Sequence, residues 1–331
     1  PYTQWKVATN ILLDMCMNPL MESAEITRER NVIHEELRMY TDHPSYQSEL
    51  GIEELMFPEH PMGREIVGSH ESLEDLKQSE IQAYFYEHYN PSNLIITITG
   101  NFPEEELIQS INDTTNSWIR SNSLINSVEH IPNHIASRLV TYDQISDHTY
   151  INLGIQGLEF SHSLSPLLNL TNIILGEGMS SRLFIKIREE LGLAYDISSS
   201  VNTYHETGTW LINCSVKNSN CMSAVEAILE ELYSLTNSVT TQELLNVKQY
   251  AKGKLLMAME DTEKLSVMIG LHTLLSGDLL DFNETIEQWD SFTVENLHEM
   301  SRTLITNTPK FLSVGGAKVS NHQLALEKLL A

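Results

Sequence analysis

Two glutamates in one charged segment have a spacing that suits a metal site. Glu29 and Glu36 are seven residues apart in the stretch 26–40, whose composition favours a helix. Seven residues make about two helical turns, so both carboxylates lie on one face. Stacked carboxylates can serve a cation, one as a ligand and the other holding the ligand shell or its water. The same spacing also occurs on an ordinary solvated helix face.

A second chemical pair flanks Gly192. Arg188 and Tyr195 stand on either side of this glycine, where a helix should end and a strand begin. A guanidinium and a phenol at such a junction can converge on one carbonyl oxygen and stabilise the charge that develops there. The alternative is an arginine in a surface ion pair beside a half-buried tyrosine. The glycines at 176 and 178 do not form a dinucleotide-binding pattern.

Other reactive residue types give weaker signals. His34, His43, His60 and His70 cluster in the sequence, but no pair has a tight ligand spacing around a carboxylate. The chain contains no Gly-x-Ser-x-Gly pattern and no cysteine–histidine arrangement that indicates a covalent nucleophile. The sequence therefore does not predict an enzyme that works through a covalent serine or cysteine nucleophile.

The amino-acid composition limits which partners the protein could bind and in which compartment of the cell it could lie. The 331 residues include 20 basic and 45 acidic side chains, a formal net charge of −25. This charge argues against nucleic acid or an anionic membrane as a partner, and agrees either with a self-repelling soluble surface or with a cationic ligand. No apolar run approaches the roughly 20 residues of a membrane span. Three scattered cysteines, Cys16, Cys214 and Cys221, favour a reducing compartment and thus a cytoplasmic location.

The elements that carry these residues alternate between helices and strands. The pattern predicts a helix opened by a capping box at Ser79 and Gln82, and a strand at Leu94–Thr99. Further strands are expected at 138–141, 148–155, 195–203, 208–216 and 310–314, and further helices at 166–175, 183–190, 222–235, 240–259 and 294–304.

An internal repeat organises the chain into two copies of one α+β unit. The order helix, X-Pro, short strand, Gly occurs at 79–100 and again at 293–315, and segment 25–39 aligns with 243–257. Val247 and Lys254 match Glu29 and Glu36, as expected if only one copy carries a site. The second copy has about 155 residues before its closing helix–strand pair and the first about 78, so roughly 75 residues of the first copy should precede residue 1. The absence of a starting Met agrees. The predicted domains are 1–118 and 138–331, joined by a polar linker at 119–137.

These motifs resemble a known family. The segments Glu-Arg-Asn-Val-Ile-His-Glu-Glu (29–36), Met-Tyr-Thr-Asp-His-Pro (39–44), Pro-Met-Gly (61–63) and Asn-Pro-Ser-Asn (90–93) are similar to the pitrilysin/insulinase family of inverted-zincin metallopeptidases, which includes the mitochondrial processing peptidases. Gly-Met-Ser-Ser-Arg-Leu-Phe (178–184) and Arg-Glu-Glu-Leu-Gly-Leu-Ala-Tyr (188–195) resemble the family's second-domain signature. The likeness covers nearly the whole chain in order.

The resemblance implies a fold and a set of roles. The fold would be α+β, with two homologous domains, each a mainly antiparallel sheet covered by helices, closing like a clamshell around a peptide. Glu36 matches the family's distal glutamate zinc ligand, and Glu29 the acid that supports catalysis. Arg188 and Tyr195 match the pair that reaches the substrate backbone. The family's His-x-x-Glu-His helix should lie before residue 1, and this chain contains no such motif.

The sequence therefore predicts the truncated body of a zinc endopeptidase that acts on peptides or small unfolded polypeptides. The 331-residue chain alone is expected to be inactive, because only one zinc ligand lies within it. Its size suggests the short two-domain branch of the family, in which the chain pairs with a second copy or with a sister subunit. One alternative is a noncatalytic companion subunit that binds peptide or scaffolds a complex. Another is an acidic binding module without peptidase ancestry, for which all the motif matches would be accidental.

Overall fold

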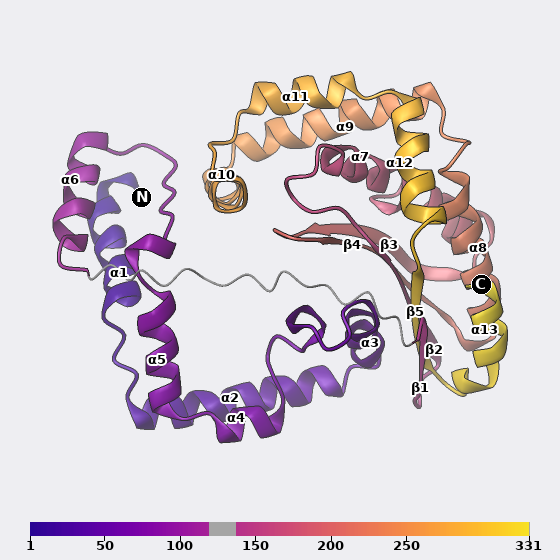
Figure 1. The fold of residues 1–331 in the computed structure, drawn as a ribbon, viewed down its shortest axis with the longest axis horizontal. Coiled ribbons are helices and arrows are strands. Elements are labelled where there is room, and N and C mark those ends of the chain that lie inside the picture. The colour runs from indigo at the N-terminus through magenta and orange to yellow at the C-terminus, as the bar shows by residue number, and fades with distance from the viewer. Residues whose placement is uncertain (119–136, 331) are drawn as a thin grey trace. The chain divides into compact units, whose positions relative to one another are not determined.

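One five-stranded sheet is the centre of the larger part of the molecule. The computed structural model describes residues 1–118 and 137–330. Its strands are β1 (Leu139–Asp143), β2 (His148–Gln156), β3 (Ala194–Thr203), β4 (Gly208–Lys217) and β5 (Lys310–Gly316), arranged in the order β1-β5-β2-β4-β3 (Figure 1). The β1–β5 pair is parallel and the other pairs are antiparallel, so the sheet is mixed. All seven residues of β5 are buried, as a central strand requires.

Helices cover one face of this sheet and build the main core. These are α7 (Ser165–Gly176), α8 (Cys221–Ser234), α12 (Val294–Thr306) and α13 (Gln323–Leu329), with α9 (Thr241–Met259) and α11 (Phe282–Ser291) beyond them (Figure 1). Alternate residues of β2, namely Ile151, Leu153 and Ile155, are fully buried in the cluster that these helices complete. The period of two puts one set of side chains into that core.

The helix α3 (Tyr46–Met56) packs against the opposite face of the sheet. Its Ile52 and Met56 form a small cluster with Phe57 and Phe311 of β5. Glycine permits this close approach, because a side chain at Gly154 would overlap the sulfur of Met56, only 2.5 Å away. The β-sheet is thus covered on both faces.

The chain divides into two compact units, neither of which is continuous in sequence. Unit 2 contains the sheet and comprises residues 39–66, 137–256 and 281–330. Unit 1 comprises residues 1–38, 67–118 and 257–280. Its helices are α1 (Trp5–Met17), most of α2 (Ser23–Thr41), α4 (His70–Asp75), α5 (Gln78–His88), α6 (Glu104–Thr115) and α10 (Thr262–Ser276). Short 3₁₀ turns occur at Tyr2–Gln4, Pro61–Gly63, Pro91–Asn93, Asn218–Asn220 and Val319–His322.

The α+β class is confirmed, but the expectation of a sheet in each half is not. Within the described residues only one sheet forms, and the predicted strand Leu94–Thr99 is extended without strand partners. The start predicted for α5 was also wrong. The helix begins at Gln78, because the Lys77 N–H donates to the Glu80 carboxylate at 2.8 Å. The predicted segment 183–190 is a π-helix over Phe184–Glu190.

The predicted linker at 119–137 lies almost wholly outside the described residues. The helices at 26–40 and 240–259 are confirmed as α2 and α9. None of the helices in the described ranges is both long enough and apolar enough to cross a bilayer.

Candidate functional site

One face of α2 is fixed by its packing within unit 1. Arg30 donates from Nε to the carbonyl of Leu73 at 2.8 Å and from Nη2 to the carbonyl of Leu76 at 2.7 Å. These carbonyls belong to the end of α4 and the residue that follows it, which have no helical partners of their own. Leu37, one turn further along α2 than His34, is buried. The rotation of α2 about its axis is therefore set.

Two of the clustered histidines meet on this packed face. His34 Nδ1 lies 2.6 Å from His70 Nδ1, and His34 Nε2 lies 3.1 Å from Oε1 of Glu74. His34 is buried and both of its nitrogens are used. The pair therefore links α2 to α4.

Glu29 and Glu36 lie away from that packed face. Both are exposed, and neither carboxylate forms a hydrogen bond or ion pair with a described residue. Across residues 1–118 and 137–330, no group of three or more histidine, cysteine, aspartate or glutamate side chains could hold a metal ion. The described residues alone therefore cannot form a catalytic zinc site, since such a site requires three protein ligands.

Arg188 and Tyr195 are positioned by two backbone irregularities in succession. The π-helix Phe184–Glu190 ends through a hydrogen bond from Leu191 N–H to Lys186 O, 3.0 Å long, and Gly192 then turns the chain with φ at +60°. In β3, Ala194 pairs with Val216 and Asp196 with Ser215, which leaves Tyr195 as the extra residue of a β-bulge. π-Helical turns and bulges both recur next to functional sites, where they re-aim a side chain.

These irregularities bring the two predicted side chains together. The guanidinium carbon of Arg188 lies 5.5 Å from the ring centroid of Tyr195 and 4.7 Å from that of Phe184. The side chain of Tyr195 is 80% exposed, so its hydroxyl is open to a ligand. Arg188 also lies near Glu189, at 3.9 Å, which is a weak contact at an exposed position. The arrangement offers guanidinium N–H groups and a phenol at one edge of unit 2.

Part of the segment 178–184, which resembles the family's second-domain signature, borders a cavity of about 570 Å³ in unit 2. Gly178, with φ at +90°, and Arg182 line this cavity together with Val247 and Tyr250 of α9. Lys254, which corresponds to Glu36 in the alignment of the two repeat copies, forms an ion pair with Glu177. Val247, the counterpart of Glu29, is buried. The second copy therefore presents an apolar residue and an ion-paired lysine where the first presents two free carboxylates.

Arg182 supports this wall of the cavity through a network. It donates to Glu243 at 2.9 Å and to the hydroxyls of Ser234 and Ser238, each at 2.8 Å. Burial opposes ionisation of Glu243, but hydrogen bonds from the Thr240 N–H and the Arg182 guanidinium outweigh it and hold the pKa of this carboxyl below its usual range. The predicted capping box of Thr240 and Glu243 is confirmed.

An acidic hollow in unit 2 was not found by sequence reasoning. Its volume is about 460 Å³, and its lining includes Tyr46, Glu49, Glu53, Glu65 and Tyr204. Burial, followed by the neighbouring charges of Glu65 and Glu49, raises the pKa of Glu53. The sequence signal was the i, i+4 pair Glu49 and Glu53 on one helix face, which only the fold places beside Glu65.

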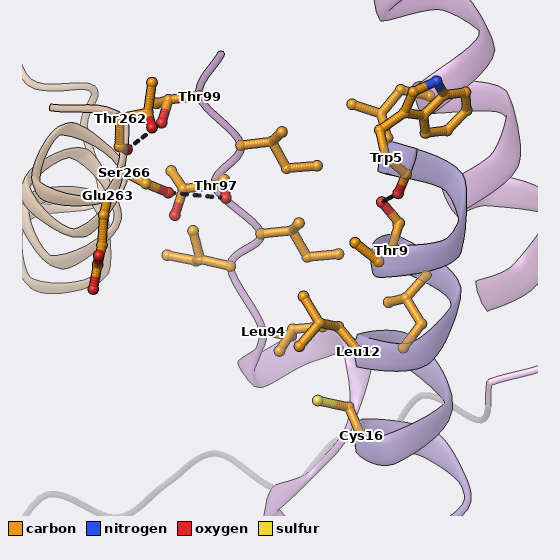
Figure 2. A pocket seen from close by; sticks show the side chains of 16 residues that line it. Trp5, Thr9, Leu12, Cys16, Leu94, Thr97, Thr99, Thr262, Glu263 and Ser266 are labelled. Carbon is orange, nitrogen blue, oxygen red and sulfur yellow. Dashed lines mark hydrogen bonds between the residues drawn. The ribbon is translucent and has the colours of Figure 1, made fainter. Parts of the chain in front are cut away.

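A groove in unit 1 is the largest of these features, and most of the residues that line it are apolar. Its volume is about 600 Å³, and the extended segment 94–99 runs between α1 and α10 (Figure 2). Leu94 points toward Leu12 of α1, whereas Thr97 and Thr99 point toward α10 (Figure 2). Ser266 donates to the carbonyl of Thr97 at 3.1 Å, and Thr99 donates to the carbonyl of Thr262. Cys16 lies at one end of the groove (Figure 2).

Comparison with known proteins gives the family. A model described as the peptidase M16 inactive domain matches residues 75–250, which is more than half of the chain. The chain belongs to the M16 peptidase family. The predicted resemblance to pitrilysin/insulinase metallopeptidases is thereby confirmed at the level of the family. The matched range includes both Arg188 and Tyr195 but ends before α10 and begins after α2.

Related M16 sequences extend beyond this chain. A Bacillus subtilis protein named uncharacterized zinc protease YmxG is 27% identical over 300 residues, which cover 90% of this chain and 72% of the relative. An uncharacterized zinc protease of Rickettsia felis is 27% identical over 290 residues, covering 85% and 67%.

Solved structures agree on the M16 fold. The peptidase M16 inactive domain from Pseudomonas fluorescens superimposes with a TM-score of 0.87 at 17% identity, covering 94% of this chain and 74% of the other. A chain in complex III2 from Candida albicans gives a TM-score of 0.83 at 16% identity, covering 99% and 79%. At these identities the likeness concerns the fold alone.

Proposed function

We propose that this chain is the larger part of a zinc-dependent M16 endopeptidase that hydrolyses peptides or small unfolded polypeptides. The observation that carries the proposal is the pair of exposed, unpartnered carboxylates of Glu29 and Glu36, in a chain that aligns with proteins named zinc proteases over nine-tenths of its length. An exposed acidic pair has no structural task in unit 1. The two carboxylates are therefore available for a zinc site whose other ligands the described residues do not supply.

In the complete protein, Glu36 would contribute one carboxylate ligand to zinc, and two histidines from a segment before residue 1 would contribute the others. Bound zinc with an open position lowers the pKa of a coordinated water. Glu29, two helical turns earlier on the same face, would hold the surrounding ligand shell. By itself, the 331-residue chain would neither retain catalytic zinc nor cleave peptides.

Arg188 and Tyr195 would bind the peptide backbone near the bond that is cut. Both side chains can donate hydrogen bonds. Tyr195 is exposed at the bulge that begins β3, and Arg188, on the preceding π-helix, is partly exposed. Donors directed at one carbonyl oxygen stabilise negative charge as it forms there.

The proposed architecture has two homologous domains, 1–118 and 138–331, joined by a linker at 119–137 and closing around the peptide. The working enzyme would pair with a second copy or with a sister subunit. Its location would be cytoplasmic, since the cysteines at 16, 214 and 221 are all free.

A noncatalytic companion subunit is the second candidate function. The match of residues 75–250 to an M16 domain described as inactive favours it, as does the lack of a three-ligand metal group among the described residues. A companion would bind peptide through unit 2 and perform no chemistry. It would have no need of Glu29 and Glu36, which is why the peptidase is preferred.

Glu36→Gln in the complete protein tests the proposal. The amide keeps the size of the side chain and removes the anionic ligand, so we expect the zinc content to fall from about one ion per chain to a small fraction of that value, with loss of peptide cleavage. Glu35→Gln is the matched control, because Glu35 is also exposed on α2 and instead pairs with Arg38 at 2.5 Å.

Three results would contradict parts of the proposal. Unchanged zinc in the Glu36→Gln protein would show that Glu36 is not a ligand. A complete protein that binds no zinc and cleaves no peptide would favour the companion. Chelator-sensitive proteolysis by purified residues 1–331 would refute the expected inactivity of the chain alone.

A further inference from the structure

The short segment between Arg188 and Tyr195 is held by a residue from a distant part of the chain. The N–H of Leu193 donates to the carbonyl of Ile187, in the preceding π-helix, at 2.9 Å. The carbonyl of Leu193 accepts a hydrogen bond of 3.3 Å from Nδ2 of Asn220, which lies 27 residues further along the sequence. Leu193 is therefore fixed through both of its backbone polar groups, and one of its two partners is a side chain.

The contact from Asn220 lies immediately before the paired part of β3. The ladder between β3 and β4 begins with the pair of Ala194 and Val216, so Leu193 is the residue just outside it. Asn220 lies in the turn that follows β4, and its amide extends the pairing of the two strands by a side-chain contact. The contact therefore restricts the backbone from which the bulge at Tyr195 begins.

Asn220 makes this contact in place of a local one. It precedes the first residue of α8, where an asparagine side chain usually accepts a hydrogen bond from a backbone N–H of the first helical turn. Its side chain forms no such cap. Instead, Oδ1 accepts from the hydroxyl of Ser219 at 3.1 Å, which turns Nδ2 toward the carbonyl of Leu193. A residue that gives up a local stabilising role for a distant contact is typical of functional sites.

The side chain of Tyr195 depends on its backbone for direction. It is 80% exposed, and its ring contacts the guanidinium of Arg188, which is itself partly exposed. Few side-chain contacts therefore orient the phenol. A hydrogen-bond donor stabilises developing charge only when it is held close to the productive geometry, so the anchoring of the preceding backbone matters.

We infer that Asn220 is a positioning residue, which directs the Tyr195 hydroxyl toward the peptide carbonyl by holding the carbonyl of Leu193. Asn220 does not itself contact the substrate in this role. The inference rests on the proposed function, because it assigns Asn220 to the same site on unit 2 that would bind the peptide backbone.

Asn220→Asp in the complete protein removes the donor and keeps the size of the side chain. A carboxylate cannot donate to the Leu193 carbonyl, but it is favourable beside the N-terminus of α8. The lost hydrogen bond and the gain at the helix terminus are similar in size, so we expect an unchanged Tm. Asn283→Asp is the matched control, because it makes the same change at an exposed position in the first turn of α11.

Peptide cleavage separates a positioning role from a structural one. We expect kcat of Asn220→Asp to fall about tenfold and KM to change by less than about twofold, because a misdirected hydroxyl stabilises the transition state less while the other peptide contacts remain. In a Tyr195→Phe background, the same substitution should not lower kcat further, since the hydroxyl that it directs is absent. A merely structural residue would lower kcat in both backgrounds.

Hydrogen exchange tests the contact without any enzymatic activity. In the complete protein, Asn220→Asp should make the amide of Leu193 exchange with deuterium about tenfold faster, because local opening of the junction becomes easier. The amides of β2 should keep their exchange rates, and Asn283→Asp should leave both sets unchanged.

An unchanged exchange rate at Leu193 would overturn the inference. Wild-type kcat in Asn220→Asp would also overturn it, as would an equal loss of kcat with and without the Tyr195 hydroxyl. Failure of the proposed function gives a different result. An unsubstituted complete protein that cleaves no peptide would refute the peptidase, while exchange at Leu193 would still decide whether Asn220 holds the junction.

Discussion

At the scale of residues, Tyr195 combines an unusual backbone position with an open side chain. The bulge between Ala194 and Asp196 removes it from the alternation of β3, and Gly192 brings it within cation–π distance of Arg188. An alternating strand without the bulge would shift the following side chains to the other face. The backbone thus presents one phenol to solvent without disturbing Ile197, which stays in the core.

Tyr195→Phe should separate the hydroxyl from the ring. The ring contact with Arg188 would remain, while the donor to the substrate carbonyl is lost, so we expect kcat/KM for peptide cleavage by the complete protein to fall roughly 10²-fold. Thermal stability should be unchanged, since the side chain is exposed. Tyr86→Phe, at another exposed tyrosine, serves as the control. Full activity of Tyr195→Phe would exclude the assigned role.

Glu243 should make stability depend on pH. Its pKa is lower in the folded protein than in the unfolded chain, so its contribution is present above roughly pH 4.3 and is lost as the pH falls through the folded value. Glu243→Gln should therefore lower the free energy of unfolding by about 0.5–1 kcal/mol at pH 7 and by less at pH 3. Urea melts at the two pH values, with Glu226→Gln as the control, would measure this difference. A pH-independent loss would contradict it.

At the scale of elements, local sequence signals predicted what local contacts determine. The helix of residues 26–40 and the capping box at Thr240 and Glu243 depend on hydrogen bonds within a few residues, and both are confirmed. The box predicted at Ser79 failed because Glu80 caps Lys77 instead, two residues earlier. Strand 94–99 has the right composition, but pairing depends on partners distant in sequence.

Two glycines on neighbouring helices should respond oppositely to alanine. A Cβ at Gly176, the last residue of α7, would lie 2.7 Å from the backbone nitrogen of Ser199 in β3. Backbone cannot move aside easily, so we expect Gly176→Ala to destabilise the protein by about 2 kcal/mol or more. Gly253, inside α9, has nothing within 4 Å of its Cβ position. Gly253→Ala should stabilise by about 0.5–1 kcal/mol.

Chemical denaturation of the two glycine variants would measure how each substitution changes the free energy of unfolding. Equal effects would show that helix propensity rather than the close approach of α7 to β3 decides the outcome at Gly176. A stabilised Gly176→Ala protein would contradict the packing described for unit 2.

At the scale of the whole molecule, the two units differ in how much apolar surface they bury. Unit 2 contains both hydrophobic clusters, and unit 1 contains isolated buried side chains. Local opening requires less free energy where few apolar contacts must be broken. In residues 1–331, amides of α1 and α10 should therefore exchange with deuterium at least a hundredfold faster than those of β2, β4 and β5. Uniform protection across both units would contradict this expectation.

At the candidate site, too, the sequence predicted contacts between neighbouring residues but not contacts between residues that are distant in sequence. It placed Arg188 and Tyr195 at one junction, and the structure brings them into contact. It could not find the acidic hollow, because Glu65 joins Glu49 and Glu53 only through tertiary folding. It could not reveal that His34 and His70 satisfy each other, since they are 36 residues apart. The roles of Glu29 and Glu36 stay predictions.

The position of β5 has a consequence for synthesis of the protein. This central strand lies far behind β1 in the sequence, so it leaves the ribosome later, and among the described strands β1 pairs with no other. At typical elongation rates, β1 would wait roughly 10–30 s for it. During that interval the nascent chain carries an open sheet edge on β2, which makes it a natural client for a chaperone that shields such edges.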